Sequence, residues 1–323
     1  MRKTVALLAL LLAYGTPWAR AQVAVPEIGP VAVRLYDSRE AITPSNNIVP
    51  DNPAALQWGA PSRIAGGTLN GHKSDQVDGK STSYKGTFGG LRWVEQRTSI
   101  AVAGLDYKVD FPAGAPTPHL ERHLSSGAIA FSVPTTLAWG FGVTHLNATT
   151  IPGSPVQETD ARGWTLGASW RLSEGFFLGA GYGKEKATLS NPPLAQTGQF
   201  DRSHNMVGIG LRGGGTLVWH LEVDRLHRDD YKDNTGFVVL PGYDQSLYTA
   251  EGILGSWLFG YAGYTIDGQG PNQSRVQGYS ADFGYAPLNG LTLTWRYENS
   301  KHSIAGLQVS SESLNSVALA WQF

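Results

Sequence analysis

Hydrophobic and polar side chains alternate along most of this chain, from about residue 62 to the last residue. In the segment LVWHLEV, residues 217–223, every odd position is apolar, whereas His220 and Glu222 fall at even positions. The segments LTLTWRYE (291–298) and GWTLGASWR (163–171) follow the same period of two. Successive side chains of a β-strand point to opposite faces, so this period is typical of strands. The pattern predicts an all-β protein.

The alternation divides into fourteen predicted strands. They lie near residues 62–70, 84–93, 98–107, 125–133, 136–146, 162–172, 175–186, 203–212, 216–226, 246–254, 257–267, 275–286, 290–299 and 313–323. Connections after the even-numbered strands are short, and those after the odd-numbered strands are mostly long. Outer-membrane barrels have an even number of antiparallel strands, short periplasmic turns and longer extracellular loops. We therefore predict a transmembrane antiparallel β-barrel of about fourteen strands, with both termini in the periplasm.

A water-soluble β-sandwich would also alternate, with its apolar face inside. Two features argue against a sandwich: the face opposite the apolar one is small or polar rather than rich in Lys and Glu, and aromatic residues gather near strand ends. Amphipathic rings favour the two interfaces of a membrane. The predicted strands place Trp93, Trp139, Trp170, Trp219, Trp257 and Trp321 at the periplasmic side, and Tyr84, Tyr107, Tyr264, Tyr279 and Tyr297 toward the outer side.

The last strand ends on a phenylalanine with no polar tail after it. Val317, Leu319, Trp321 and Phe323 share one face of this strand, which we expect to meet lipid. The arrangement resembles the C-terminal β-signal of bacterial outer-membrane proteins, whose terminal aromatic residue is read by the barrel-assembly machinery. That machinery is therefore an expected partner during biogenesis. The alternative, an ordinary final strand of a sandwich, does not explain the missing polar tail.

The N-terminus has the three parts of a secretory signal. Arg2 and Lys3 precede an apolar run over residues 4–14, and Ala19-Arg20-Ala21 offers a small-residue cleavage site. An uncleaved membrane anchor is the alternative, but the run is shorter than the ~20 residues that a spanning helix needs. We expect residues 1–21 to be a cleaved signal peptide and the mature protein to reach the bacterial outer membrane.

Composition narrows the remaining chemistry. The 323 residues carry a formal net charge of -1, which gives no electrostatic reason to expect nucleic-acid binding. The chain has no cysteine, so disulfides, zinc–thiolate sites and a catalytic thiol are excluded. The segment HRDDYKDN, residues 227–234, fits a solvated acidic loop better than a metal site. We expect no cofactor and no metal.

Residues 22–60, between the signal and the first predicted strand, do not alternate and include a Pro- and Asn-rich stretch. This arm carries Asn52, Pro53 and Ala54, followed by Ala55 and Leu56. An exported chain with this segment, about fourteen strands and a terminal phenylalanine resembles the FadL family of outer-membrane channels for long-chain fatty acids and other hydrophobic compounds. The resemblance implies that residues 22–60 fold into the lumen as a hatch and that residues 61–323 form the barrel.

The resemblance also implies a route for the ligand. In the family, ligands are thought to leave sideways through a wall gap at a kinked strand, and Gly104 in the third predicted strand is a candidate for such a kink. At the outer side, the loop GFVVLPGY offers an apolar capture surface made of Phe237, Val238, Val239, Leu240 and Tyr243. The alternative for this loop is packing against other loops to close the barrel.

Charged residues fall on the polar face that we expect to line the lumen. They are Arg171, Arg212, His220, Glu222, Asp224, Glu251, Asp282, Arg296 and Glu298. Both signs occur together, so each charge can be paired, as a plugged lumen requires. We expect a mainly structural role for them and predict an ion pair between Arg296 and Asp282. A general diffusion porin can carry a similar set, but it would not need the arm.

The sequence therefore predicts a channel for passive uptake of hydrophobic small molecules, either long-chain fatty acids or aromatic hydrocarbons. Outer-membrane lipid and lipopolysaccharide would surround it. A lipid hydrolase is the enzymatic alternative, with His220, Glu222 and Asp224 as candidates, but no serine can be assigned to them and no G-x-S-x-G segment occurs. We expect no enzymatic activity. A plugged general porin and a barrel for protein secretion or envelope assembly remain open.

Overall fold

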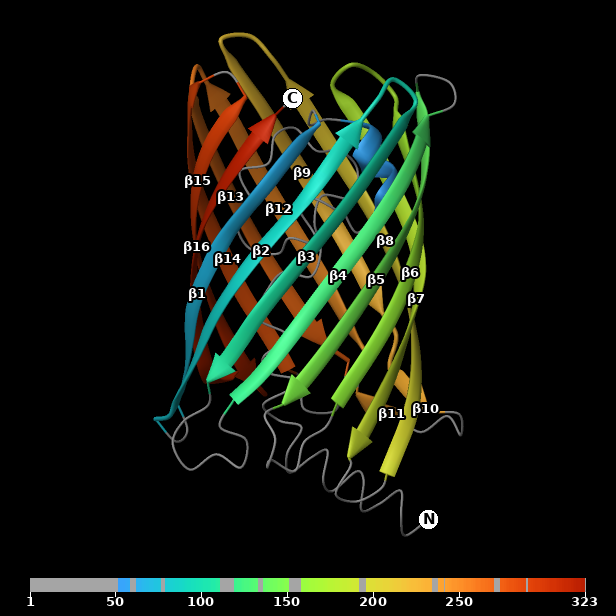
Figure 1. Cartoon of the computed structure of the whole chain (residues 1–323), viewed down its shortest axis with the longest axis vertical. Coiled ribbons are helices and arrows are strands. Elements are labelled where there is room, and N and C mark those ends of the chain that lie inside the picture. The colour runs from blue at the N-terminus through green and yellow to red at the C-terminus, as the bar shows by residue number, and fades with distance from the viewer. Residues whose placement is uncertain are drawn as a thin grey trace.

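The computed structural model describes residues 52–58, 62–76, 79–110, 119–132, 136–150, 158–191, 196–233, 238–240, 242–269, 274–288 and 290–322. Within them, fourteen long strands form one closed antiparallel barrel (Figure 1). The strands are β1 (Arg63–Asp75), β2 (Ser81–Val94), β3 (Thr98–Asp110), β4 (His119–Ser132), β5 (Leu137–Thr150), β6 (Glu158–Arg171), β7 (Phe176–Asn191), β8 (Gln196–Gly213), β9 (Leu217–Arg228), β12 (Tyr243–Leu254), β13 (Trp257–Gly268), β14 (Ser274–Leu288), β15 (Leu291–Ile304) and β16 (Leu307–Gln322). The predicted all-β barrel is confirmed.

Each barrel strand pairs with its neighbours in the barrel, and β1 closes on β16. Ile64 pairs with Trp321 and Arg63 with Gln322, so the outward and inward faces continue across the closing seam. Short connections join the strands at the end drawn at the top of Figure 1, where β16 also ends. Outer-membrane barrels have short turns at their periplasmic end, so we assign this end to the periplasm.

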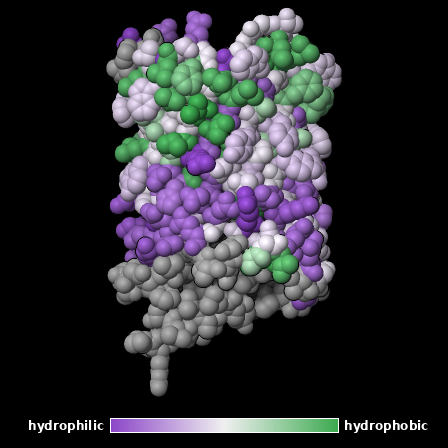
Figure 2. Space-filling model, turned by 180° about the vertical axis from the view of Figure 1, so that it is seen from behind, coloured by the Kyte–Doolittle hydropathy of each residue, from purple (hydrophilic) through white to green (hydrophobic). Residues whose placement is uncertain are grey.

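The apolar face of the strands points outward. Trp219, Leu293 and Trp321 are 38%, 49% and 63% exposed, as expected for side chains that meet lipid rather than a globular core. On β9, the four outward residues nearest the periplasmic end are apolar, and Arg225 and His227 follow them. In Figure 2, hydrophobic and pale side chains fill the upper part of the outer face, and a hydrophilic belt lies beneath them. The apolar band and the polar collar beyond it match a transmembrane barrel.

The strands extend further at the outer end than the sequence pattern predicts. The last two predicted strands were expected to flank a long loop, but β15 and β16 meet in a tight turn at Ala305 and Gly306. Both turn residues have positive φ, 50° and 82°, as a two-residue β-hairpin turn requires. The long connection after β9 contains a small hairpin of β10 (Tyr231–Asp233) and β11 (Val238–Leu240), and β10 pairs with the outer part of β8.

The tyrosines sort less simply than predicted. Tyr279 points outward, but Tyr84 and Tyr264 point into the barrel and are buried, so their placement in an outer membrane belt is wrong. Tyr264 is held inside because its hydroxyl donates to Oε1 of Glu298 at 2.8 Å. The side chain of Tyr107 lies outside the described residues. The described residues include no helix long and apolar enough to cross a membrane.

Candidate functional site in the barrel lumen

The Asn-Pro-Ala segment forms a single turn of 3₁₀-helix, η1 (Pro53–Gln57), inside the barrel near the periplasmic end (Figure 1). Asn52 is its N-cap: the side-chain oxygen accepts a hydrogen bond from the Ala54 amide at 3.1 Å. Proline suits the first helical position because its fixed φ fits a helix and its missing N–H would have no partner there. Nδ2 of Asn52 donates to the carbonyl of Ala168 on β6 at 3.0 Å. One side chain thus shapes the turn and ties it to the wall.

Glycines on β5 and β6 make room for η1. A side chain at Gly167 would collide with the amide oxygen of Asn52, and one at Gly140 would come within 2.5 Å of the carbonyl carbon of Pro53. At Gly142, by contrast, the nearest atom of Pro53 would lie at an ordinary 3.6 Å. Gly140 and Gly167 are paired on adjacent strands, so together they form a recess in the wall. We call this recess the η1 socket.

The rest of η1 is fixed by packing and by hydrogen bonds. Leu56 is fully buried in a cluster whose wall residues are alanines: Ala65, Ala101, Ala103, Ala128, Ala130 and Ala320. Small side chains let the turn approach the backbone of the wall closely. The Gln57 amide donates to the carbonyl of Gln96 at 3.2 Å and accepts from Ser99 Oγ at 3.1 Å. Residues 52–58 are therefore docked on the inner wall, and residues 22–51 and 59–60 of the predicted arm lie outside the described residues.

The predicted lumen charges lie on the inner face. Arg171 and Arg212 are half-buried, and the other seven are buried: His220, Glu222, Asp224, Glu251, Asp282, Arg296 and Glu298. Nε of Arg296 lies 3.3 Å from Oδ1 of Asp282, as the sequence predicted, and Nη2 lies 3.7 Å from Oε2 of Glu298. Nη2 also donates to Ser280 Oγ at 2.8 Å. One guanidinium thus balances two carboxylates on β14 and β15.

His220 sits between two carboxylates. Nε2 lies 3.0 Å from Oε2 of Glu222, and Nδ1 lies 3.4 Å from Oε2 of Glu251 on β12. With a carboxylate at each ring nitrogen, neither is placed to take a proton from a serine, as a hydrolytic triad would require. Among the described residues, no group of three or more His, Asp or Glu side chains is arranged to hold a metal ion.

A second charged cluster near the outer mouth was missed by the sequence prediction. Arg202 holds Glu185 through Nη2 at 2.6 Å and Nε at 2.7 Å, and Arg228 lies 3.3 Å from the same carboxylate. His204 is 3.6 Å from Glu185 and its other nitrogen is 3.1 Å from Thr165 Oγ1. The predicted strand 203–212 began after Arg202 and the predicted strand 216–226 ended before Arg228, so the alternation was not followed far enough to place them inside.

Next to this charged cluster the inner wall is apolar. Met206, Leu226, Leu247, Ala262, Tyr264, Ile266 and Val276 form one buried cluster on β8, β9 and β12–β14. Tyr243 packs against it, and the guanidinium of Arg228 lies 5.7 Å from the centre of the Tyr243 ring. We call this set the inner apolar cluster. The sequence pattern predicted a polar inner face, so this cluster was not expected.

The predicted capture residues are only partly described. Val238, Val239 and Leu240 form β11, and Tyr243 is the first residue of β12, at the edge of the inner apolar cluster. Phe237 lies outside the described residues. In the predicted β-signal, Val317, Leu319 and Trp321 point outward and are exposed, whereas Phe323 is outside the described residues.

The wall is continuous at the glycine expected to mark a kink. Gly104 pairs with Gly89 on β2 and with Ser125 on β4, and neither ladder has a register shift. The expected kink is therefore absent from this part of β3. Gly66, Gly89 and Gly104 pair in a row, so the outer face of β1–β3 shows backbone where other strands carry bulky side chains.

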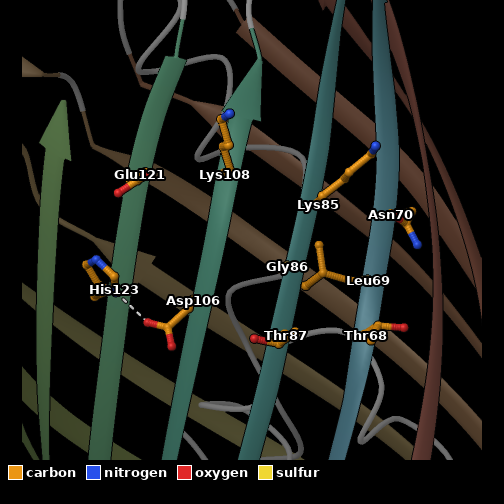
Figure 3. A pocket seen from close by; sticks show the side chains of 10 residues that line it. All are labelled: Thr68, Leu69, Asn70, Lys85, Gly86, Thr87, Asp106, Lys108, Glu121 and His123. Carbon is orange, nitrogen blue, oxygen red and sulfur yellow. Dashed lines mark hydrogen bonds and ion pairs between the residues drawn. The ribbon is translucent and has the colours of Figure 1, made fainter. Parts of the chain in front are cut away.

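A cavity of about 500 Å³ opens on the outer face of β1–β4, within the polar collar (Figure 3). Lys85, Lys108 and Glu121 line it together with a hydrogen-bonded pair, His123 and Asp106. These side chains share the face of the outward apolar residues, so the cavity does not open into the lumen. It is separate from the lumen.

Comparison with known proteins supports the fold. No protein-family model matches the sequence, and no curated protein matches it. Among solved structures, the monoaromatic hydrocarbon channel CymD matches with a TM-score of 0.60 and 13% identity, over 88% of this chain and 94% of that one. The toluene transporter TodX of Pseudomonas putida matches with a TM-score of 0.55 and 11% identity, over 91% and 95% of the two chains.

A FadL homologue of Pseudomonas aeruginosa matches with a TM-score of 0.54 and 12% identity, over 84% of this chain and 93% of that one. The chain thus has the barrel fold of FadL-type channels, and the resemblance expected from the sequence is confirmed at the level of fold. All three of these neighbours are described as channels, transporters or their homologues.

Proposed function

We propose that this protein is a bacterial outer-membrane channel for the passive uptake of hydrophobic small molecules. The observation that carries the proposal is the inner apolar cluster, seven buried residues on the lumen side of the wall near the outer mouth. The lumen of a diffusion porin is polar and filled with water. An apolar inner patch instead lowers the free energy of a hydrophobic molecule that leaves the water at the mouth.

The docked η1 supports a hatch at the other end. It occupies the periplasmic part of the lumen, where it is held by the η1 socket, by the alanine-lined wall and by hydrogen bonds to β6 and to the turn after β2. We propose that residues 22–60 close the channel at rest and that 61–323 form its wall. A molecule that passes the mouth would then wait in the lumen until the hatch moves.

We further propose that residues 1–21 direct export and are cleaved, and that the last strand is read by the barrel-assembly machinery through Val317, Leu319, Trp321 and Phe323. The exposed apolar band fits outer-membrane lipid, and the polar collar fits lipopolysaccharide above it. The extracellular β11 segment and Tyr243 would receive the ligand first.

Uptake by whole cells tests the proposal. Labelled oleate and labelled toluene are supplied to a host that lacks its own transporters for them and expresses this chain. We expect faster uptake of at least one compound than in the empty host, and loss of the gain when Leu247→Gln places an amide in the inner apolar cluster. Leu314→Gln, in a separate buried cluster on β16, is the control for the general cost of an inward amide.

Two results would contradict the channel proposal. One is equal uptake of both compounds with and without the protein, once folded barrel has been demonstrated in the outer membrane by its heat-dependent mobility on a gel. The other is a large ion conductance after removal of residues 22–60, without any uptake of hydrophobic compounds, which would identify a plugged porin.

A further inference from the structure

The inner apolar cluster encloses one side chain of the opposite character. Gln245 lies on the inner face of β12 and is 1% exposed. It pairs in register with Leu226 on β9 and with Ile266 on β13, both members of the cluster. Within the part of the chain that the structure describes, neither Oε1 nor Nε2 of Gln245 has a hydrogen-bond partner.

An unpartnered buried amide needs an explanation. It has given up its hydrogen bonds to water and gained none in the protein, which destabilises the fold unless another molecule supplies them. A leucine or methionine at this position would fill the same space without that cost. Other inward polar groups nearby do have partners: Glu185 is held by arginines and Tyr264 by Glu298.

The position of Gln245 in the wall suggests which molecule comes close. Tyr243, two residues earlier on the same face of β12, is the first residue after the extracellular connection and packs against the cluster. The amide therefore lies just inside the mouth, surrounded by apolar side chains. It is almost fully buried in this structure, so a ligand that binds it must displace the groups that cover it.

We propose that Gln245 is the polar anchor of a binding subsite for hydrophobic molecules that carry one hydroxyl group, such as long-chain alcohols or alkylphenols. The inference rests on the proposed channel function and specifies its substrate class. A hydroxyl group donates to Oε1 and accepts from Nε2, so it satisfies both atoms of the amide. A hydrocarbon satisfies neither, and a carboxylate, which only accepts, leaves Oε1 without a donor. The apolar body of the ligand would lie on Leu226, Leu247 and Ile266.

Binding of matched ligands tests the subsite. The purified full-length protein is titrated in detergent with dodecan-1-ol, dodecane and dodecanoate, and the dissociation constants are measured by calorimetry with detergent-only blanks. We expect the alcohol to bind about tenfold more tightly than the alkane, as two modest hydrogen bonds would give. In Gln245→Met, which keeps the length and removes the amide, this preference should disappear. Gln277→Met, on the exposed outer face of β14, should leave it unchanged.

Each other outcome decides against the subsite. Equal binding of alcohol and alkane by the natural protein, or a preference that survives Gln245→Met, would mean that the amide holds an internal water only. Tightest binding of dodecanoate, lost in Arg228→Gln but kept in Gln245→Met, would assign recognition to the charged cluster instead. If none of the three compounds binds, the subsite is refuted, and the uptake assay decides separately whether the channel function stands.

Discussion

The η1 socket makes a prediction that one methyl group can test. Gly140→Ala would place a Cβ within 2.5 Å of the carbonyl carbon of Pro53 and 2.9 Å of its Cβ. These atoms belong to a rigid proline and its backbone, so they cannot rotate away. We therefore expect η1 to leave the socket in this variant, while the barrel itself remains folded because its ladders do not depend on η1.

The size of the effect depends on the free energy that holds η1 in the socket. Burial of Leu56 contributes about 1.5–3 kcal/mol, and the hydrogen bond from Asn52 to the wall adds about 0.5–1.5 kcal/mol. Overpacking at a fixed site costs about 1–3 kcal/mol. The cost of overpacking is comparable to the free energy that holds η1 in place. Each ~1.4 kcal/mol changes an equilibrium tenfold, so the fraction of molecules with η1 undocked should rise about 10–100-fold.

The natural absence of cysteine supplies the assay. A single cysteine placed at Ala55, which is fully buried in the docked segment, reports undocking through its rate of reaction with a maleimide in the native protein. We expect labelling to be slow in the parent and about 10–100-fold faster with Gly140→Ala. Gly142→Ala is the matched control, because it lies on the same strand and face but would make only ordinary contacts of 3.6–3.7 Å. Equally slow labelling in both variants would refute the socket as the site that holds η1.

Two further predictions concern the wall. Arg296→Met should lower the unfolding free energy by about 3–5 kcal/mol, because it removes the cation beside the buried Asp282. Arg275→Met, in an exposed ion pair, should lower it by at most about 1 kcal/mol. Denaturant unfolding in lipid vesicles measures both, and similar losses would contradict the role of the buried pair. Leu319→Arg on the lipid face should lower the unfolding free energy by about 2–4 kcal/mol. Asn315→Arg, in the polar collar of the same strand, should lower it by about 0–1 kcal/mol. Equal losses in the same unfolding assay would mean that the collar lies within the hydrocarbon.

The fold was predictable from sequence because lipid imposes a simple rule. Wherever a strand crosses hydrocarbon, every second side chain must be apolar, and the fourteen predicted strands all follow from that rule. Beyond the hydrocarbon the rule lapses. Lys184, Glu185 and Lys186 are charged on both faces of β7, so alternation gives no sign that the strand continues to Asn191.

The candidate site was predictable only where it reuses a local motif. Asn52 followed by Pro53 is typical of a capped helical turn and can be recognised from sequence alone. Gly140 and Gly167, which make room for that turn, cannot be told apart from the many other glycines of the chain without the fold. The β15–β16 hairpin was missed because Ala305-Gly306 is not one of the strong turn dipeptides. Gln245 was missed because its strand was expected to begin one residue later.

The barrel strands differ in length. β8 has 18 residues and is flanked further out by β10, whereas β12 and β13 have 12 each. Six residues of a tilted strand correspond to about 15 Å of height. The strand-paired wall is therefore shorter at β12 and β13, which carry Leu247 and Ile266, than at β8. In the proposed channel, a hydrophobic molecule would reach the inner apolar cluster by the shortest route over this part of the wall.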